Sequence, residues 1–464
     1  MPTKSIIRLM PHTLTHALTR ARQRPGRLSL AAGLAAVTTV LTCLAVGSAS
    51  AAPGRPARAG TAGSAGTATA MHPLVCGPPD FFIQCYSPGQ YQVAYGVAPL
   101  LKSGITGRGE TVVMPELANA PGPNYTDIRK DLAAFDHRFG LPAAKLKVTT
   151  TLAGGSAPYV AGTEEVEDTE IVHAIAPGAA LDVVLVPHNA TASAANFTAA
   201  LTGLIHTAIA QRVAVISISG SKGEHLFTPA EVTRIHAALT EAASHRVTVV
   251  ASSGDTGVIS DNGPPKQVSL PASDPLVLAV GGTILGAASP GGTYHGEMAW
   301  NGGTDASAGG YSSLYPRPSY QDGVPRPGAP VADNGLAGDG RGVPDVAASA
   351  DHASGMALAT SDGSLRSAVG TSGSTPLWAG VIALADSAAG HSLGFVNPAL
   401  YAIARGPAYH RAFHDVVTGD NSVVWPTGVF TGYDAGRGWD PVTGWGSPDA
   451  QYLVPLLART ALSQ

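Results

Sequence analysis

The sequence is poor in charge and carries no excess of basic residues. Charged residues make up 13% of the 464 positions, aromatic residues 6%, and the formal net charge is −4. Such a chain has no basic footprint for nucleic acid or for an anionic membrane surface, so we expect neither as a partner. Apolar residues make up 44%, which is enough to form a large buried core and excludes global disorder.

Cysteine is nearly absent, with three residues in the whole chain. So few thiols, without other ligands nearby, disfavour a metal site or a catalytic thiol. Cys43 lies in an N-terminal apolar run, and Thr42 before it is a poor match to a lipoprotein signal. In an exported chain the other two most simply form one disulfide, Cys76–Cys85, which closes a short loop.

The first fifty residues have the order of a secretory signal: a basic region, an apolar run from about residue 28 to 46, and small residues around Ala51. The alternative is an uncleaved membrane anchor, but the apolar run is near the lower length limit for a span, and the small residues favour cleavage. We therefore expect residues 1–51 to be a signal peptide. The protein is then secreted, without stable membrane association after cleavage.

The remaining chain divides into a short N-terminal segment and one large domain. Residues 52–86 read as a linker that contains the disulfide, and residues 53–70 within it are rich in Ala, Gly, Thr and Arg. From residue 87 to 464, apolar β-branched runs alternate with helical patterns. Strands are predicted at Thr111–Met114, Leu181–Val186, Val213–Ile218, Val247–Ala251 and Val277–Val280, and helices at Glu164–Ile175, Ser193–Gln211 and Pro229–His245.

This alternation predicts parallel βαβ units: an α/β domain with a mainly parallel central sheet and helices on both faces. No fixed-period repeat is present. After Gly281 the chain is rich in Gly, Pro and Ser, and we expect long loops as far as about Gly342. In such a fold, sites gather beyond the carboxyl ends of the strands.

The first candidate for chemistry is Ser372, in a polar turn that leads into the apolar run Leu377–Ala385. That run predicts a buried helix, whose N-terminal N–H groups would favour a developing oxyanion. The simpler interpretation is that Ser372 is a helix N-cap. Taken alone, the turn favours the cap.

Two acidic positions are also candidates. Glu164 and Asp168 lie four residues apart, so in a helix they share one face with Ile171 and Ile175. The alternative is that acids in a first helical turn complement the helix dipole and stay solvated, as we expect for Glu165 and Glu170, which point elsewhere. Asp255 follows a predicted strand between glycines, which is typical both of a turn and of an active-site position.

Taken together, these segments resemble the sedolisin family of serine-carboxyl peptidases, which have a subtilisin-like three-layer fold. The resemblance covers nearly the whole chain from Ser87 onward. One Gly-Thr-Ser triplet is weak evidence, whereas the ordered series is strong. The series is Ala174-Ile175-Ala176-Pro177-Gly178-Ala179, Ser253-Gly254-Asp255, Leu270-Pro271-Ala272-Ser273, Ala279-Val280-Gly281-Gly282-Thr283, Tyr315-Pro316-Arg317-Pro318, Gly340-Arg341-Gly342-Val343-Pro344-Asp345-Val346-Ala347, Gly370-Thr371-Ser372, Gly436-Arg437-Gly438-Trp439-Asp440-Pro441 and Thr443-Gly444-Trp445-Gly446.

The resemblance implies a role for each candidate. Ser372 matches the nucleophile, Glu164 the base that takes its proton, Asp168 the residue that orients that base, and Asp255 the acid that completes the oxyanion hole. A carboxylate base has a low pKa, so the resemblance implies activity in acid unless burial raises that pKa. In acid, Asp255 can be protonated and donate to the oxyanion.

His173 offers a competing, subtilisin-like triad. A triad histidine would stand at a helix start, whereas His173 lies near the end of the predicted helix and off the stripe of Glu164 and Asp168. We interpret it as a helix or core histidine.

The C-terminal region resembles the family's calcium site. The resemblance implies side-chain oxygens from Asp415 and Asp440, and backbone carbonyls from Val416, Gly436 and Gly438. One structural calcium ion would tie the C-terminal segment to the domain. The alternative is a plain Asx/Gly turn.

Two departures from the family pattern bear on function. Members usually carry a long folded pro-segment, whereas here only residues 52 to about 86 lie between the expected cleavage and the matching region. Ile218-Ser219-Gly220-Ser221 lacks an aromatic residue that several members place near the substrate, and Thr256 replaces the usual serine after Asp255. The missing pro-segment concerns folding and inhibition, and the missing aromatic residue concerns substrate preference, whereas the change at Thr256 is small.

Three functions remain open. The leading one is a secreted, acid-active, monomeric endopeptidase that acts on proteins or peptides through a Ser372 acyl-enzyme. The second is a tripeptidyl exopeptidase of the same family. The third is a non-catalytic binding protein on the same scaffold.

Overall fold

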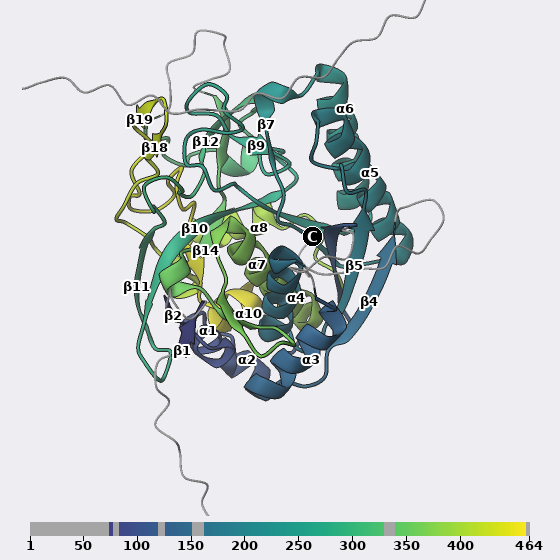
Figure 1. Ribbon diagram of the computed structural model, residues 1–464. Helices are drawn as coiled ribbons and strands as arrows, with labels where there is room; N and C mark the ends of the chain where they lie inside the picture. Colours follow the sequence, from purple (N-terminus) through teal and green to yellow (C-terminus); the bar gives the residue numbers. More distant parts are fainter. Residues whose placement is uncertain (1–73, 78–82, 119–125, 151–161, 329–338, 461–464) are drawn as a thin grey trace, which may run out of the picture. The chain divides into compact units, whose positions relative to one another are not determined.

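The computed structural model describes residues 74–77, 83–118, 126–150, 162–328 and 339–460 (Figure 1). All of them fall in the unit Thr67–Gln464. The expected signal peptide and residues 53–70 of the expected linker lie outside the described residues. No helix in these described ranges combines the length and the apolar character needed to cross a membrane.

An eight-stranded sheet forms the centre of the unit, in the order β11-β10-β8-β6-β3-β5-β4, with β14 also paired to β10. The pairings are parallel except that of β10 with β11, so the predicted mainly parallel sheet is confirmed. The strands are β3 (Thr111–Leu117), β4 (Lys145–Thr150), β5 (Ala180–Val186), β6 (Val215–Ile218), β8 (Thr248–Ser252), β10 (Leu278–Ala287), β11 (Tyr294–Ala299) and β14 (Val346–Ser349).

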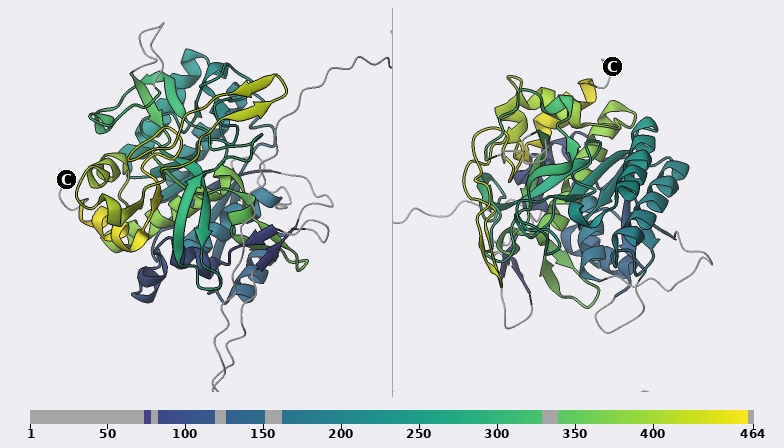
Figure 2. Two further views of the ribbon diagram at one scale, coloured as in Figure 1. Left: turned by 90° about the vertical axis from the view of Figure 1, so that its left-hand side faces the viewer. Right: turned by 90° about the horizontal axis from the view of Figure 1, so that it is seen from above.

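Helices cover both faces of this sheet (Figures 1 and 2). α5 (Ala194–Gln211) and α6 (Pro229–Ser244) pack side by side on one face, whereas α4 (Thr163–Ile175), α7 (Gly370–Ala389) and α10 (Ala450–Thr460) lie on the other. Because successive strand residues point to opposite faces, Val215 enters the core beneath α7 and Ile216 enters the core beneath α5 and α6. The central strands β5, β6 and β8 are buried on both faces, which is why they read as continuous apolar runs in the sequence.

The remaining elements frame this centre. The shorter helices are α1 (Pro88–Ala94), α2 (Ala98–Lys102), α3 (Ile128–Phe139), α8 (Asn397–Ala404) and α9 (Tyr409–Ala412). Paired short strands are β1 (Leu74–Cys76) with β2 (Ile83–Cys85), β7 (Lys222–Gly223) with β9 (Ser269–Leu270), β12 (Gly310–Pro316) with β13 (Gly340–Val343), β15 (Ala357–Ala359) with β16 (Leu365–Ser367), β17 (Phe413–His414) with β20 (Ser447–Pro448), and β18 (Val423–Trp425) with β19 (Gly428–Phe430). Single turns of 3₁₀ helix are η1 (Glu224–Leu226), η2 (Ser319–Gln321) and η3 (His352–Ser354).

The expectation of long loops from Gly281 to about Gly342 is wrong in part, because this region contains most of β10, all of β11 and β12, and the start of β13. The glycines serve close packing here. A Cβ on Gly281 would lie 2.7 Å from the Pro344 ring, and one on Gly282 would lie 2.9 Å from the Trp300 ring. Glycine in a strand marks such close approaches as well as loops.

The N-terminal hairpin belongs to the domain, although the sequence suggested a linker. Cys76 and Cys85 form the expected disulfide, with Cα atoms 6.0 Å apart. Gly77 N donates to Leu365 O at 2.9 Å, which fastens the hairpin to β16. β16 in turn leads directly to α7.

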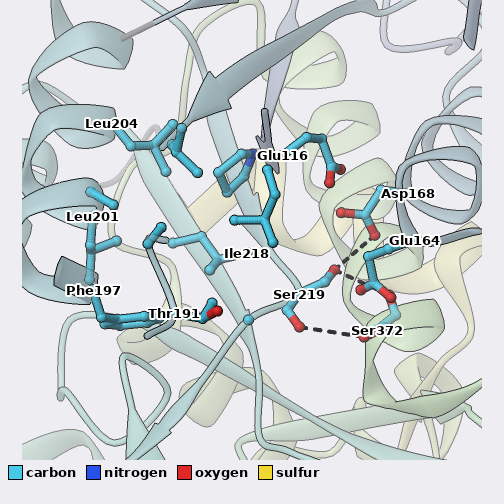
Figure 3. Close-up of a pocket in the computed structure, with 16 residues that line it drawn as sticks. Glu116, Glu164, Asp168, Thr191, Phe197, Leu201, Leu204, Ile218, Ser219 and Ser372 are labelled. Atoms are coloured by element: carbon cyan, nitrogen blue, oxygen red, sulfur yellow. Dashed lines mark hydrogen bonds between the residues drawn. The ribbon is translucent and has the colours of Figure 1, made fainter. Parts of the chain in front are cut away.

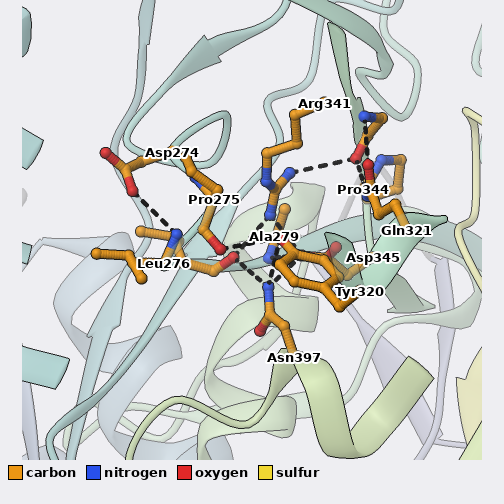
Figure 4. A network of polar contacts seen from close by, with 12 residues as sticks. Asp274, Pro275, Leu276, Ala279, Tyr320, Gln321, Arg341, Pro344, Asp345 and Asn397 are labelled. Atoms are coloured by element: carbon orange, nitrogen blue, oxygen red, sulfur yellow. Dashed lines mark hydrogen bonds and ion pairs between the residues drawn. The ribbon is translucent and has the colours of Figure 1, made fainter. Parts of the chain in front are cut away.

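A buried polar network fixes the turn between β13 and β14 (Figure 4). Arg341 and Asp345 are fully buried and form an ion pair of 2.7 Å. Arg341 Nη2 also donates to Val277 O at 2.7 Å, and Asp345 accepts from Ala279 N at 2.8 Å and from the Tyr401 hydroxyl at 2.9 Å. The pair therefore joins the start of β10 to α8, and its hydrogen bonds offset the cost of burying two charges.

Candidate active site

Ser372 is the third residue of α7, not its N-cap. The N-cap position is taken by Val369, which offers no side-chain hydrogen bond, so the cap interpretation of Ser372 is wrong. Ser372 is half-buried, and its side chain lines a cavity beyond the carboxyl ends of β3, β5 and β6 (Figure 3). The helix N-terminus places positive potential there.

Asp255 supplies the cap that Val369 lacks. Its Oδ1 accepts from Thr371 N at 2.8 Å and from Thr371 Oγ1 at 2.7 Å. Gly370 has φ +80°, and a Cβ there would lie 2.5 Å from Asp255 Oδ2, so only glycine fits between them. Burial raises the pKa of Asp255, and the bonds from Thr371 oppose that rise. The candidate oxyanion acid is thus fixed to the turn that carries Ser372.

Glu164 and Asp168 reach the same cavity from α4 (Figure 3). Ser372 and Glu164 line this cavity together, and the Ser372 hydroxyl donates to Ser219 O at 3.4 Å. Desolvation by the surrounding protein raises the pKa of Glu164 to about 7, while the nearby Ser372 hydroxyl opposes the rise. Glu164 is exposed at the mouth of the cavity, and hydration of its charged form also opposes the rise in its pKa. The structure therefore brings three of the four predicted residues to one cavity, with Asp255 at the adjoining turn.

Glu116, at the carboxyl end of β3, is a member of this site that the sequence interpretation missed. It is 4% exposed and lines the cavity beside Asp168. Burial raises the pKa of both carboxyls well above their ordinary values, and the hydrogen bond between them favours the proton on Glu116. A charged residue that ends an apolar strand was the available signal.

The expectation that Glu165 and Glu170 are surface charges is wrong. They are 4% and 0% exposed, because α4 is enclosed by α1, α3, α7 and β15. Glu165 accepts from Gly162 N at 2.6 Å, and Glu170 accepts from Ala359 N at 2.9 Å. From Glu165 onward α4 is buried on all sides, so it has no solvent face on which to place acids.

Glu167 is a further buried acid of α4 and contacts the start of α7. It is 1% exposed, and its Oε1 accepts from Val369 N at 3.0 Å. A Cβ on Gly373 would lie 2.6 Å from that same oxygen. Glu167 thus fixes the position of α4 against the turn that carries Ser372.

His173 is a core histidine, as the sequence suggested. It is fully buried, with Nε2 2.8 Å from Pro142 O and 3.0 Å from Asp136 Oδ1. Burial lowers its pKa. No histidine of the described ranges lines the Ser372 cavity, so the subtilisin-like triad is contradicted.

The cavity has a volume of about 290 Å³ and two chemically different ends. Carboxyls and hydroxyls occupy the end at Ser372 (Figure 3). Phe197, Leu201 and Leu204 of α5, with Ile218 of β6, form the apolar end. The absence of an aromatic residue after β6 leaves this space open.

The two aspartates of the expected calcium site face one loop. Asp440 is 1% exposed and accepts from Gly436 N at 3.0 Å, while Asp415 accepts from Gly438 N at 3.1 Å. Neither has a Lys or Arg partner among the described residues, and burial raises the pKa of Asp440 to about 7. Two carboxylates without a basic counter-charge fit a hard cation. The described ranges hold no cluster of three or more His, Cys, Asp or Glu that could bind a metal, so backbone carbonyls would have to complete the set.

Residues 150–399 match the family model described as Subtilase family, so the chain belongs to the subtilase family. Its relatives include kumamolisin of Bacillus sp. (strain MN-32), 34% identical over 369 residues and 77% of this chain. Sedolisin of Pseudomonas sp. (strain 101) is 39% identical over 225 residues, or 46% of this chain. Within the subtilases, the chain is a member of the sedolisin family.

A solved structure agrees with this assignment. Pseudomonas sedolisin, complexed with two molecules of pseudo-iodotyrostatin, matches with a TM-score of 0.66 and 27% identity over 82% of this chain and 99% of that one. Tripeptidyl-peptidase 1 of Homo sapiens is 31% identical over 264 residues, or 54% of this chain. The chain spans 62% of kumamolisin, 35% of sedolisin and 43% of tripeptidyl-peptidase 1.

Proposed function

We propose that the protein is a serine-carboxyl peptidase that hydrolyses peptide bonds with Ser372 as nucleophile and Glu164 as base. The observation that carries this proposal is that Ser372, at the N-terminal turn of α7, lines one cavity with Glu164 and Asp168. A serine hydroxyl needs an adjacent base and a third group that orients the base, and Asp168 stands one helical turn from Glu164.

In the first half-reaction, Ser372 Oγ attacks the scissile carbonyl carbon and its proton passes to Glu164. Protonated Asp255 and the N–H groups of the α7 turn stabilise the oxyanion. Collapse of the tetrahedral intermediate breaks the C–N bond, and Glu164 returns the proton to the leaving amine. Water then attacks the acyl-enzyme while Glu164 accepts its proton. As the bond from the acyl carbon to Ser372 Oγ breaks, Glu164 returns that proton to Oγ, which regenerates Ser372 and releases the carboxylic acid.

For substrate, we propose proteins or peptides that place an apolar side chain in the cavity. Its apolar end is formed by Phe197, Leu201 and Leu204, and it adjoins the reacting serine. We favour internal cleavage, as an endopeptidase. The likeness to a protein named tripeptidyl-peptidase 1 makes release of tripeptides the second candidate.

The decisive experiment is hydrolysis of denatured protein from pH 3 to 8 by the purified protein and its Ser372→Ala variant. We expect hydrolysis by the wild type alone. Its activity should rise with increasing pH toward pH 7, because Glu164 must be ionised to act as the base. Equal activity in both, or no activity in the folded wild type, would contradict the proposal and favour a binding protein. Mass spectrometry of the products separates internal cuts beside apolar residues from tripeptides alone.

Two further parts of the proposal concern the molecule's surroundings. We propose that it is secreted as a monomer after loss of residues 1–51. We also propose that one calcium ion is held by Asp415 and Asp440 with the carbonyls of Val416, Gly436 and Gly438. The ion would stabilise the C-terminal segment and would take no part in bond cleavage.

A further inference from the structure

Ser219 follows β6 and lies between the two helices that carry the catalytic candidates (Figure 3). Its hydroxyl donates to Asp168 Oδ1 at 2.8 Å. Its carbonyl oxygen lies 3.4 Å from Ser372 Oγ and accepts from it. One residue thus contacts both the acid pair and the nucleophile.

Pro376 explains why Ser219 can approach Ser372 from the backbone side. Pro376 lies inside α7, four residues after Ser372, and has no N–H to donate. The Ser372 carbonyl therefore lacks its helical partner, and Ser219 Oγ lies 3.4 Å from it. The hydroxyl has one proton, and the shorter contact, to Asp168, is the one that uses it.

We propose that Ser219 is a positioning residue that couples the Glu164–Asp168 pair to the nucleophile. The Ser219 hydroxyl holds the Asp168 carboxyl in position toward Glu164. The Ser219 carbonyl accepts the hydrogen bond from Ser372 before substrate binds, and Ser372 breaks that bond when it donates to Glu164. This inference rests on the proposed peptidase function.

The coupling has a consequence for the pH profile. Repulsion from Glu164 raises the pKa of Asp168, whereas donation from Ser219 lowers it and favours the ionised form of Asp168. Loss of that donor raises the pKa of Asp168, so Asp168 is less often ionised and repels the charge of Glu164 less. The acidic limb of kcat, which follows the ionisation of Glu164, should then move to lower pH.

The test compares Ser219→Ala and Ser219→Thr by kcat and KM from pH 3 to 8 on one peptide substrate. For the alanine variant we expect a loss of roughly ten- to a hundredfold in kcat, typical of losing a hydrogen bond to a charged group, with KM nearly unchanged. The acidic limb should move to lower pH. Threonine keeps the hydroxyl and should restore both the rate and the limb.

Ser217→Ala is the matched control, because Ser217 points to the same face of β6, is fully buried, and has an Oγ without a hydrogen-bond partner. It should leave kcat and the pH profile unchanged. If Ser219→Ala does not fold, Ser219→Cys replaces it, because a thiol of similar size is a weaker donor and should give a partial loss.

An unchanged profile in folded Ser219→Ala would overturn the inference, and so would equal losses in the alanine and threonine variants. Failure of the proposed function looks different, since Ser372→Ala would then retain the wild-type rate whatever occupies position 219.

Discussion

Asp255 holds the start of α7 with one carboxyl oxygen and leaves the other against Gly370. This division would allow one residue to cap a helix and still take the oxyanion role that we propose for it. The oxygen that accepts from Thr371 is occupied, so the proton needed for donation belongs on Oδ2. A carboxyl whose pKa is raised by burial carries that proton over a wider pH range.

Replacing Asp255 with Asn should extend activity to higher pH. The amide oxygen can still accept from Thr371, and the amide nitrogen donates at every pH, whereas Asp255 stops donating once it ionises. We expect kcat within about tenfold of the wild type in acid and a weaker decline on the alkaline side. Asp255→Ala should lose roughly a hundred- to a thousandfold. An Asn variant as inactive as the Ala variant would contradict this role.

At the scale of elements, α4 buries more of its carboxyls than its sequence suggested. Glu165, Glu167, Asp168 and Glu170 are all nearly or fully buried. Burial raises the pKa of Glu167, Asp168 and Glu170 well above their ordinary values. Such groups are protonated in the folded state at a pH where they would be ionised in the unfolded chain.

Glu167 therefore makes folding depend on pH. Its neutral form contributes stability that is fully present below its unfolded pKa, near 4.5, and that is lost as the pH rises through its folded pKa. Glu167→Gln stays neutral and can still accept from Val369. By thermal unfolding we expect a gain of a few degrees at pH 7 and almost none at pH 4. The control Glu241→Gln, at an exposed position, should leave the melting temperature unchanged at both pH values. A loss of stability of Glu167→Gln at pH 7 would contradict the assignment.

The elements found from sequence are those whose pattern depends on burial alone. β3, β5, β6 and β8 are apolar because both faces are covered, so their runs predicted them. β4 was missed because it is an edge strand that alternates Lys and Thr with apolar residues.

The residues of the candidate site also divide into those that the sequence predicted and those that it missed. The resemblance placed Ser372, Glu164, Asp168 and Asp255, because each lies in a recognisable motif. Glu116 and Ser219 join them through contacts made across 52 and 51 positions from Asp168, a proximity that only the fold creates.

At the scale of the molecule, the C-terminal segment returns to the sheet through the loop that contains Asp440. Gly446 N donates to Thr443 O at 3.0 Å, and its carbonyl accepts from Ala347 N of β14 at 2.9 Å. A cation bound between Asp415 and Asp440 would therefore reinforce the contact of the last helix region with the central sheet.

Removal of calcium should lower the melting temperature. Saturating calcium contributes about 2.7 kcal/mol at a hundredfold excess over Kd, so chelation should cost a few degrees, and added calcium should restore them. Asp440→Asn should abolish the response, whereas Asp434→Asn, an exposed neighbour outside the proposed ligand set, should retain it. A melting temperature indifferent to chelator and calcium would rule out the ion.

The buried carboxyls also make protons a reactant in folding. When the chain folds above the ordinary carboxyl range, Glu116, Glu167 and Glu170 must each capture a proton from the medium. The measured enthalpy of unfolding near neutral pH will then include the heat of protonating the buffer, and it will change between buffers of different ionisation enthalpy. A folded molecule that moves from neutral medium into acid gains stability without any change in its contacts.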